Sequence, residues 1–476
     1  MIFNSLAFLV FAAVFFPVYF ATRGQVRMTF LVLASYFFYG WWDWRFCGLL
    51  ALSTVVDYLI GLGLGASDDP RRRKALLGLS LAVNLGILGT FKYLDFFSDS
   101  FAALAGRFGM EVTPFFAEII LPVGISFYTF QTLSYSIDLY RRKIDEPEKS
   151  FLRFAAYVAM FPQLVAGPIV RAAHVLPQLK VDQRLDWSRI GLGLQLIVWG
   201  FFLKLCLADN AAQFVAPRFD EPSIYTSPSL VLAVVLFAFQ IYGDFAGYSL
   251  IAIGLGLVMG FDLGINFNRP YHATSFSDFW ARWHISLSSW FRDYLYIPLG
   301  GNRSGRWRTL RNLVITMGLA GLWHGAAWTF VVWGLLHGAY LVIQRLVGEP
   351  LAAALRRIGT PALVLRIAAM VVVFIAVCIA WVPFRAEDFS RAGEIYGGIL
   401  SFDDEGRHFG GQRLMLLRVL AIICFVYVVD SLTLLPSVKD WAMVRPVMRT
   451  IGVAFLLWAI ALLGAFEGNI FIYFQF

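Results

Sequence analysis

Long apolar runs recur along the chain, and they restrict its fold more than any other feature of the sequence. With their flanking aromatic residues, most reach the roughly 20 residues that a helix needs to cross about 30 Å of hydrocarbon. Only helices and closed barrels satisfy their backbone in lipid, and these runs do not alternate as barrel strands do. They therefore predict an all-α polytopic membrane protein. The runs are Leu6–Phe20, Thr29–Gly40, Ala75–Thr90, Ile190–Leu207, Leu230–Tyr242, Leu363–Trp381, Leu414–Val429 and Ile451–Leu463.

The composition favours a membrane protein over a soluble or nucleic-acid-binding one. Hydrophobic residues make up 59% of the 476-residue chain and charged residues 15%, whereas soluble proteins carry about a quarter charged residues. The net charge of +8 comes from arginines in short loops between apolar runs. The positive-inside rule explains this charge without a nucleic-acid partner. The first apolar run has no positively charged start and no small-residue cleavage site, so we expect a first membrane helix rather than a signal peptide.

The basic loops also set the expected orientation in the membrane. If they face the cytoplasm, the N-terminus lies outside, and the last span leaves the basic side and puts the C-terminus outside as well. About eleven spans result. We expect one membrane domain, with spans in 1–140, a catalytic core in 150–350 and further spans in 360–476.

Two segments differ from ordinary spans. Phe151–Leu179 is apolar but interrupted by prolines, which break helices, so it is expected to be re-entrant or interfacial. The stretch Leu310–Val347 is almost uniformly apolar, and as one helix it would be roughly 55 Å long, far more than a membrane. It must bend, and Gly318, Gly321 and Gly325 offer places to do so. We therefore predict a helical hairpin that dips into the bilayer from the cytoplasmic side.

His324 has the position that most strongly indicates function. It lies deep in this hairpin, in GLAGLWHGAAWTF, where the sequence has no other ionisable side chain. Ionisable groups in the bilayer interior are costly and usually face a cavity or a partner. An imidazole ordinarily titrates at about pH 6.5 and is able to remove a hydroxyl proton at neutral pH. The alternative is a neutral ring that hydrogen-bonds to a neighbouring helix.

His284 is the second candidate. The segment SDFWARWHISLSSWFRDY places apolar residues on one face at helical spacing, so we expect one amphipathic helix that lies at the interface or lines a polar cavity. The preceding span carries Asp244, a carboxylate that indicates an interior polar path. The alternative interpretation is that Asp244 is a structural ion-pair partner for an arginine such as Arg269 or Arg282.

The remaining motifs argue mostly for structure. His337 follows His324 at a distance of roughly 20 Å on a continuous helix, so a structural role is expected. The sequence has no HExxH, Walker or GxSxG motif, and its four cysteines lie far apart, so we expect neither a metal site nor a nucleotide site.

At these residues the sequence resembles the membrane-bound O-acyltransferase family, and specifically the bacterial branch that contains the alginate O-acetyltransferase membrane subunit. The blocks that carry the resemblance are FPQLVAGPIVR, QIYGDFAGYSLIAIGLGLVMGF, NFNRPYHATSFSDFWARWHISLSSWFRDYLYIPLGG and LWHGAAWTFVVWGLLHG. The resemblance implies spanning and re-entrant helices around a funnel and a tunnel. It places the family's catalytic histidine on His324 and its second site position on His284. Asp244, Arg282 and Trp323 are then expected to line the tunnel or contact the donor.

The resemblance also implies the reaction and its setting. The expected donor is acetyl-CoA on the cytoplasmic side of a bacterial inner membrane, with no bound cofactor. The final recipient is an exopolysaccharide such as alginate, reached with a periplasmic acetyltransferase partner. The chain ends in FIYFQF, and related D-alanyl transfer systems use a small partner with a similar aromatic end. We therefore consider Tyr473 as an acyl relay, with an interfacial aromatic anchor as the equal alternative.

Three other functions compete with acetyl transfer. A D-alanyl or other acyl transferase of the same fold would carry much the same motifs. A polysaccharide transporter also needs polar residues inside the membrane, but it would often show paired repeats with broken helices in corresponding positions, and the two halves of this sequence do not match in that way. A scaffold of a secretion complex leaves the costly position of His324 unexplained.

Overall fold

The computed structural model describes residues 1–110, 119–303, 305–403, 405–409, 411–432, 446–466 and 471–472. Within these ranges the chain forms helices and no β-strand, apart from one isolated bridge between Tyr225 and Arg407. The prediction of an all-α membrane protein is thus confirmed.

Seven helices in the described part of the chain are long and apolar enough to cross a membrane. One of them, Trp44–Gly65, is absent from the predicted runs because polar residues such as Asp57 interrupt it. Two shorter apolar helices, Leu6–Ala21 and Met448–Leu463, accompany them, and a count of about eleven spans stays a prediction. The other long helices are Pro70–Gly106, Trp187–Asp220, Ser227–Met259, Trp328–Arg357, Ala362–Arg385 and Arg413–Ser431.

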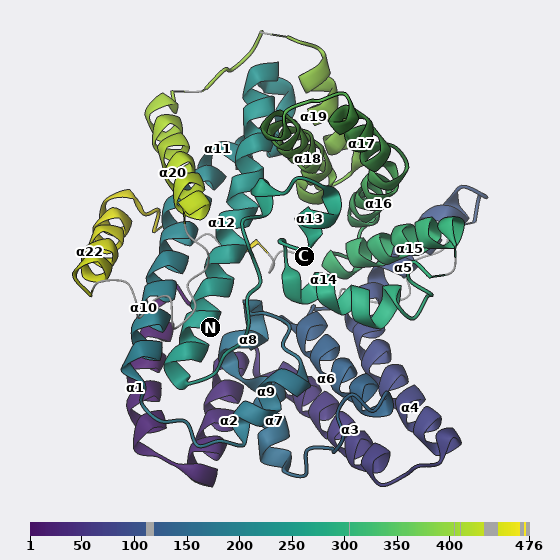
Figure 1. The fold of residues 1–476 in the computed structure, drawn as a ribbon, viewed down its shortest axis with the longest axis vertical. Coiled ribbons are helices and arrows are strands. Elements are labelled where there is room, and N and C mark those ends of the chain that lie inside the picture. The colour runs from purple at the N-terminus through teal and green to yellow at the C-terminus, as the bar shows by residue number, and fades with distance from the viewer. Residues whose placement is uncertain are drawn as a thin grey trace. The chain divides into compact units, whose positions relative to one another are not determined.

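The helices fall into two compact units. Unit 1 comprises Met1–Ile197 with Ile251–Gly264, and unit 2 comprises Val198–Leu250 with Ile265–Phe476. In Figure 1 the purple and blue helices belong to unit 1 and the green and yellow helices to unit 2. Helix α10 (Trp187–Phe201) and helix α12 (Ser227–Met259) each contribute to both units.

Unit 1 is a bundle whose helices are joined by a buried polar network. On α3, the Asp57 carboxylate accepts hydrogen bonds from Ser80 Oγ at 2.5 Å and Asn84 Nδ2 at 2.6 Å on α4, and from Ser136 Oγ at 2.6 Å on α6. Three helices are therefore tied to one side chain. The helices of this bundle are α1 (Leu6–Ala21), α2 (Gly24–Gly40), α3 (Cys47–Gly65), α4 (Pro70–Leu88), α5 (Leu94–Gly106) and α6 (Ile125–Tyr140).

The proline-interrupted segment forms three short helices, α7 (Phe151–Ala159), α8 (Phe161–Ala166) and α9 (Ala172–Leu179). The segment is interrupted as predicted, although two of its prolines lie within helices and do not end them. Pro162 lies in the first turn of α8, where a missing backbone N–H costs nothing. Pro177 lies inside α9.

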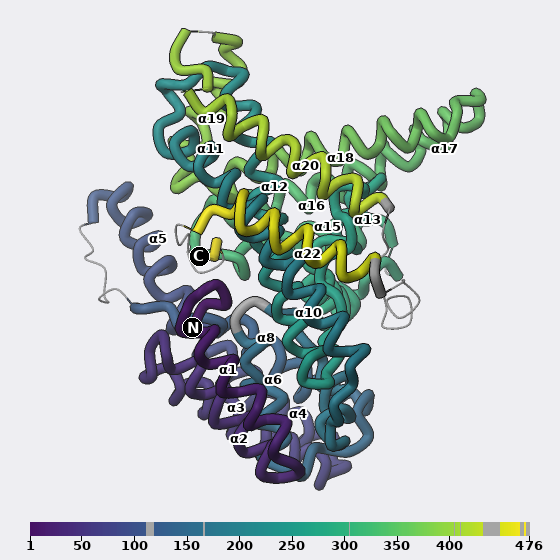
Figure 2. The backbone as a smooth tube through the Cα atoms, turned by 90° about the vertical axis from the view of Figure 1, so that its left-hand side faces the viewer, coloured from purple at the N-terminus to yellow at the C-terminus, as the bar shows by residue number. Residues whose placement is uncertain are grey.

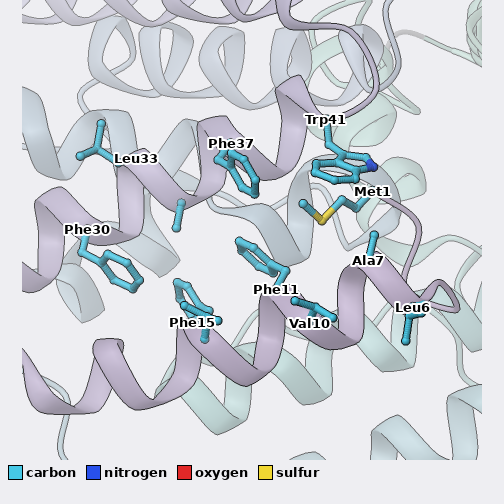
Figure 3. A pocket seen from close by; sticks show the side chains of 12 residues that line it. Met1, Leu6, Ala7, Val10, Phe11, Phe15, Phe30, Leu33, Phe37 and Trp41 are labelled. Carbon is cyan, nitrogen blue, oxygen red and sulfur yellow. The ribbon is translucent and has the colours of Figure 1, made fainter.

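An apolar groove runs between α1 and α2, with a volume of about 730 Å³. Figure 3 shows Phe11, Phe15, Phe37 and Trp41 among its lining side chains. All the side chains that line it are apolar, so it lacks the groups that acyl transfer requires.

Unit 2 contains the predicted helical hairpin. Helix α15 ends at His324, helix α16 begins at Trp328, and the break falls at Gly325. Gly321 does not bend the chain as expected. It lies inside α15, where a Cβ would overlap the Phe330 carbonyl oxygen, so its lack of a side chain lets the two arms of the hairpin touch. Gly318 likewise lies within the helix.

Helices α13 (Phe276–Trp280) and α18 (Ala362–Arg385) pack against the α16 arm of this hairpin. Figures 1 and 2 show α17 continuing from α16. Short π-helical turns, η3 (Phe202–Ala208), η6 (Arg292–Tyr296) and η7 (Gln344–Gly348), interrupt the longer helices. The helices of unit 2 are α11 (Asp209–Asp220), α13 (Phe276–Trp280), α14 (Ile285–Phe291), α15 (Arg306–His324), α16 (Trp328–Ile343), α17 (Glu349–Arg357), α18 (Ala362–Arg385), α19 (Phe389–Leu400), α20 (Arg413–Leu432) and α22 (Pro446–Leu463).

Candidate functional site

His324 is the last residue of α15 and is only 3% exposed. Its ring lies among aromatic side chains from three helices. The ring centroids are 5.1 Å from Trp323 on the same helix, 4.9 Å from Trp333 on α16 and 5.6 Å from Phe384 on α18. The hairpin thus places an imidazole at its turn, inside an aromatic enclosure that keeps bulk water away.

His284 lies between α13 and α14, not within one helix. The predicted continuous amphipathic helix is wrong, because His284 adopts a left-handed backbone conformation with φ of 43° that ends one helix before the next begins. The apolar face was nevertheless predicted well, since Phe279, Trp283 and Leu287 are all buried.

A hydrogen-bond network fixes the tautomer of His284. The Asn266 Oδ1 accepts the Ser286 backbone N–H at 3.3 Å and lies 3.1 Å from His284 Nδ1, while Asn266 Nδ2 donates to Ser249 Oγ at 3.0 Å. Because this oxygen only accepts, Nδ1 must carry the proton, and Nε2 keeps its lone pair. Burial lowers the pKa of the His284 imidazole, so the ring is neutral at physiological pH.

The structure brings the two candidate histidines together. The His284 and His324 ring centroids are 6.3 Å apart. Trp323 contacts both, at 5.9 Å from His284 and 5.1 Å from His324. Phe245 on α12 packs edge-on against His284 at 4.6 Å.

The side chain of Trp333 contacts both His324 and His337. The Trp333 ring lies 4.9 Å from each of the two imidazoles. His337 is fully buried, and neither of its ring nitrogens has a hydrogen-bond partner among the described residues. The hairpin shortens the distance expected on a continuous helix, but it places an indole between the two histidines.

The alternative interpretation of Asp244 as the partner of an arginine is wrong, because its partner is a lysine. Its Oδ1 lies 2.7 Å from Lys204 Nζ, and its Oδ2 accepts the backbone N–H of Ile472 at 2.7 Å. Arg282 instead pairs with Asp278 at 2.6 Å and is partly exposed. Arg269 donates to the Asp430 carbonyl oxygen at 3.2 Å.

Some residues around the site were missed from the sequence. Lys204 lies within the apolar run Ile190–Leu207, so the cost of a charge in lipid should have singled it out as it did His324. Asn266 and Trp333 gave no such signal, because their importance comes from contacts across the fold. Tyr473 lies outside the described residues. In the described part of the chain no group of histidine, cysteine and acidic side chains is placed to hold a metal ion.

Comparisons with known proteins identify the relatives of this chain. Residues 148–381, which include α7–α16, match the sequence profile of the membrane-bound O-acyltransferase family. A probable alginate O-acetylase AlgI of Azotobacter vinelandii is 42% identical over 85% of this chain and 79% of its own length. A peptidoglycan O-acetyltransferase of Helicobacter pylori is 37% identical over 78% of this chain and 73% of its own length.

A more distant relative transfers another group. The teichoic acid D-alanyltransferase of Streptococcus thermophilus is 31% identical, over 47% of this chain and 56% of its own length. Identity across most of the length of the acetyl-transferring relatives, together with the profile match, shows that this chain belongs to the membrane-bound O-acyltransferase family and is an O-acyltransferase of the membrane.

Proposed function

We propose that this protein takes acetyl from acetyl-CoA on the cytoplasmic side of a bacterial inner membrane and passes it toward an exopolysaccharide such as alginate. Both termini would then face the periplasm. The observation that carries the chemistry is the pair of buried imidazoles, 6.3 Å apart inside an aromatic enclosure. The choice of acetyl over D-alanyl is supported by the alginate O-acetylase relatives, which match 85% of the chain against 47% for the D-alanyl enzyme.

In this proposal His324 is the general base. Its imidazole takes the proton of an acceptor hydroxyl while the oxygen attacks the thioester carbonyl carbon. The carbon–sulfur bond then breaks, the ester remains on the acceptor, and the leaving thiolate takes the proton back from the imidazolium. A positioned base of this kind contributes about 10²–10⁴-fold to a rate.

His284 takes a different part. With its proton on Nδ1, its Nε2 accepts a hydrogen bond and does not donate one, so we assign it to orienting a hydroxyl. Stabilising a developing oxyanion would require a second proton, which burial opposes. Trp323, which touches both imidazoles, and Arg282 are the proposed donor contacts.

Tyr473 remains our proposed relay, because it is the one hydroxyl in the terminal sequence FIYFQF. Its phenol would receive acetyl and hand it to a periplasmic acetyltransferase partner. An acetyl group on Tyr473 in a trapped complex, found by mass spectrometry, is the expected result. Full activity of Tyr473→Phe without any acetyl on the tail would contradict the relay and favour an aromatic anchor.

The decisive experiment incubates the purified protein with labelled acetyl-CoA and locates the label by mass spectrometry, with a D-alanyl donor as the competing substrate. We expect transfer of acetyl and not of D-alanine. Transfer of D-alanine alone would replace the proposed donor, and transfer of neither group would exclude both.

A further inference from the structure

The last described residues of the chain are held inside unit 2 at two points. The backbone N–H of Ile472 donates to Asp244 Oδ2 at 2.7 Å. The Phe471 ring is fully buried and lies 4.3 Å from the Tyr248 ring and 5.9 Å from the Phe245 ring, all measured between centroids. Phe245 in turn contacts His284. Phe471 is therefore separated from His284 by the ring of Phe245 alone.

The Asp244 carboxylate is itself held in place by a buried ammonium. Lys204 Nζ lies 2.7 Å from both Asp209 Oδ1 and Asp244 Oδ1, and all three side chains are at most 4% exposed. One positive and two negative groups therefore share a site that water does not reach. In such a site, a charge-assisted hydrogen bond to a backbone N–H is about twice as strong as a neutral one.

Two glycines on α12 make this arrangement possible. A Cβ at Gly243 would be 2.9 Å from the Leu203 carbonyl oxygen, and one at Gly247 would be 2.7 Å from the Gly200 carbonyl oxygen. Because neither position has a side chain, α12 approaches the turn η3 closely enough for Asp244 to reach Lys204. The GDFAG part of the sequence is thus explained by helix contact on both sides of the carboxylate.

We infer that Asp244, oriented by Lys204, is a positioning residue that docks the C-terminal segment beside His284. We name the contacts of Asp244 with Lys204 and Ile472 the tail latch. This inference rests on the proposed function in one respect, because Tyr473 follows Ile472 directly in the sequence and docking of Ile472 would serve the relay. The alternative is an ion pair that only stabilises unit 2.

The charges of the tail latch supply a matched pair of variants. Asp244→Ala removes the acceptor of the Ile472 N–H and leaves the Lys204–Asp209 pair balanced. Asp209→Asn removes the same charge from the same site but leaves the acceptor in place. A purely structural ion pair would respond alike to both changes, whereas the latch responds to Asp244→Ala alone.

The test is hydrogen–deuterium exchange on the full-length protein in detergent, followed at the C-terminal peptide that contains Ile472. For Asp244→Ala we expect about 10- to 100-fold faster exchange at that amide, with peptides of the α15–α16 hairpin unchanged. Asp209→Asn should keep most of the protection. Asp244→Asn, which retains an acceptor oxygen, should lie between them.

Two results would overturn the tail latch. One is unchanged exchange at Ile472 in Asp244→Ala, and the other is equal loss of protection in both aspartate variants. Acetyl transfer is measured on the same samples, and Asp244→Ala should lower kcat while leaving the KM for acetyl-CoA unchanged. If Tyr473→Phe were fully active while the exchange data held, the relay would fail and the docking would stand.

Discussion

The two units each bury a carboxylate inside apolar helices, but they stabilise it by opposite means. In unit 1, Asp57 is surrounded by hydroxyl and amide donors from helices next to it. In unit 2, Asp244 is paired with an ammonium and with a backbone N–H more than two hundred positions away in the sequence. Burial of a charged group in a membrane helix therefore does not by itself indicate function. The partners differ, because those of Asp57 all lie in neighbouring helices whereas those of Asp244 include Ile472, the residue held in the proposed tail latch.

The largest expected effect separates chemistry from stability in unit 2. His324→Ala should lower acetyl transfer per folded molecule by about 10²–10⁴-fold, because it removes the proposed base. Turnover from acetyl-CoA and thermal unfolding in detergent are measured on the same preparation. Near-normal turnover would contradict the central assignment.

A smaller loss is expected at the second histidine. His284→Asn should lower kcat by about 10- to 100-fold, because a hydrogen-bond acceptor at Nε2 is lost. Asparagine tolerates the left-handed backbone, so stability should change little. If the variant instead unfolded without any change in the activity of the folded fraction, His284 would belong with the structural network.

The smallest effect is expected in unit 1. Asp57→Ala should destabilise the protein by about 2 kcal/mol, since it breaks three hydrogen bonds between helices, each worth on average roughly 0.6 kcal/mol in a membrane. Activity per folded molecule should stay unchanged, as measured by acetyl transfer normalised to the folded fraction. A loss of activity at constant stability would erase the distinction between the two carboxylates.

Sequence reasoning succeeded where a single segment carries the information. The length of Leu310–Val347 was enough to predict the hairpin, whose first arm ends at His324. It failed where the answer depends on other segments. The partner of Asp244 is Lys204, forty positions earlier, and no local pattern distinguishes it from a nearby arginine.

Local backbone strain was equally invisible in the sequence. The periodicity around His284 fits one helix, and the left-handed φ that divides it arises from the hydrogen bonds to Asn266 and the surrounding packed rings. The helix that carries Asp57, Trp44–Gly65, was missed because polar residues interrupt the apolar pattern from which the membrane helices were predicted.

The left-handed residue at the centre of the site also limits how this enzyme can be engineered. Libraries that vary position 284 sample backbone compatibility together with side-chain chemistry, since β-branched and bulky residues rarely adopt a φ of 43°. Isoleucine, valine or threonine at this position would fail for conformational reasons alone, and their failure would say nothing about the imidazole. Selection for new acyl acceptors is therefore better directed at Phe245 or Trp323, whose helical backbones accept most side chains.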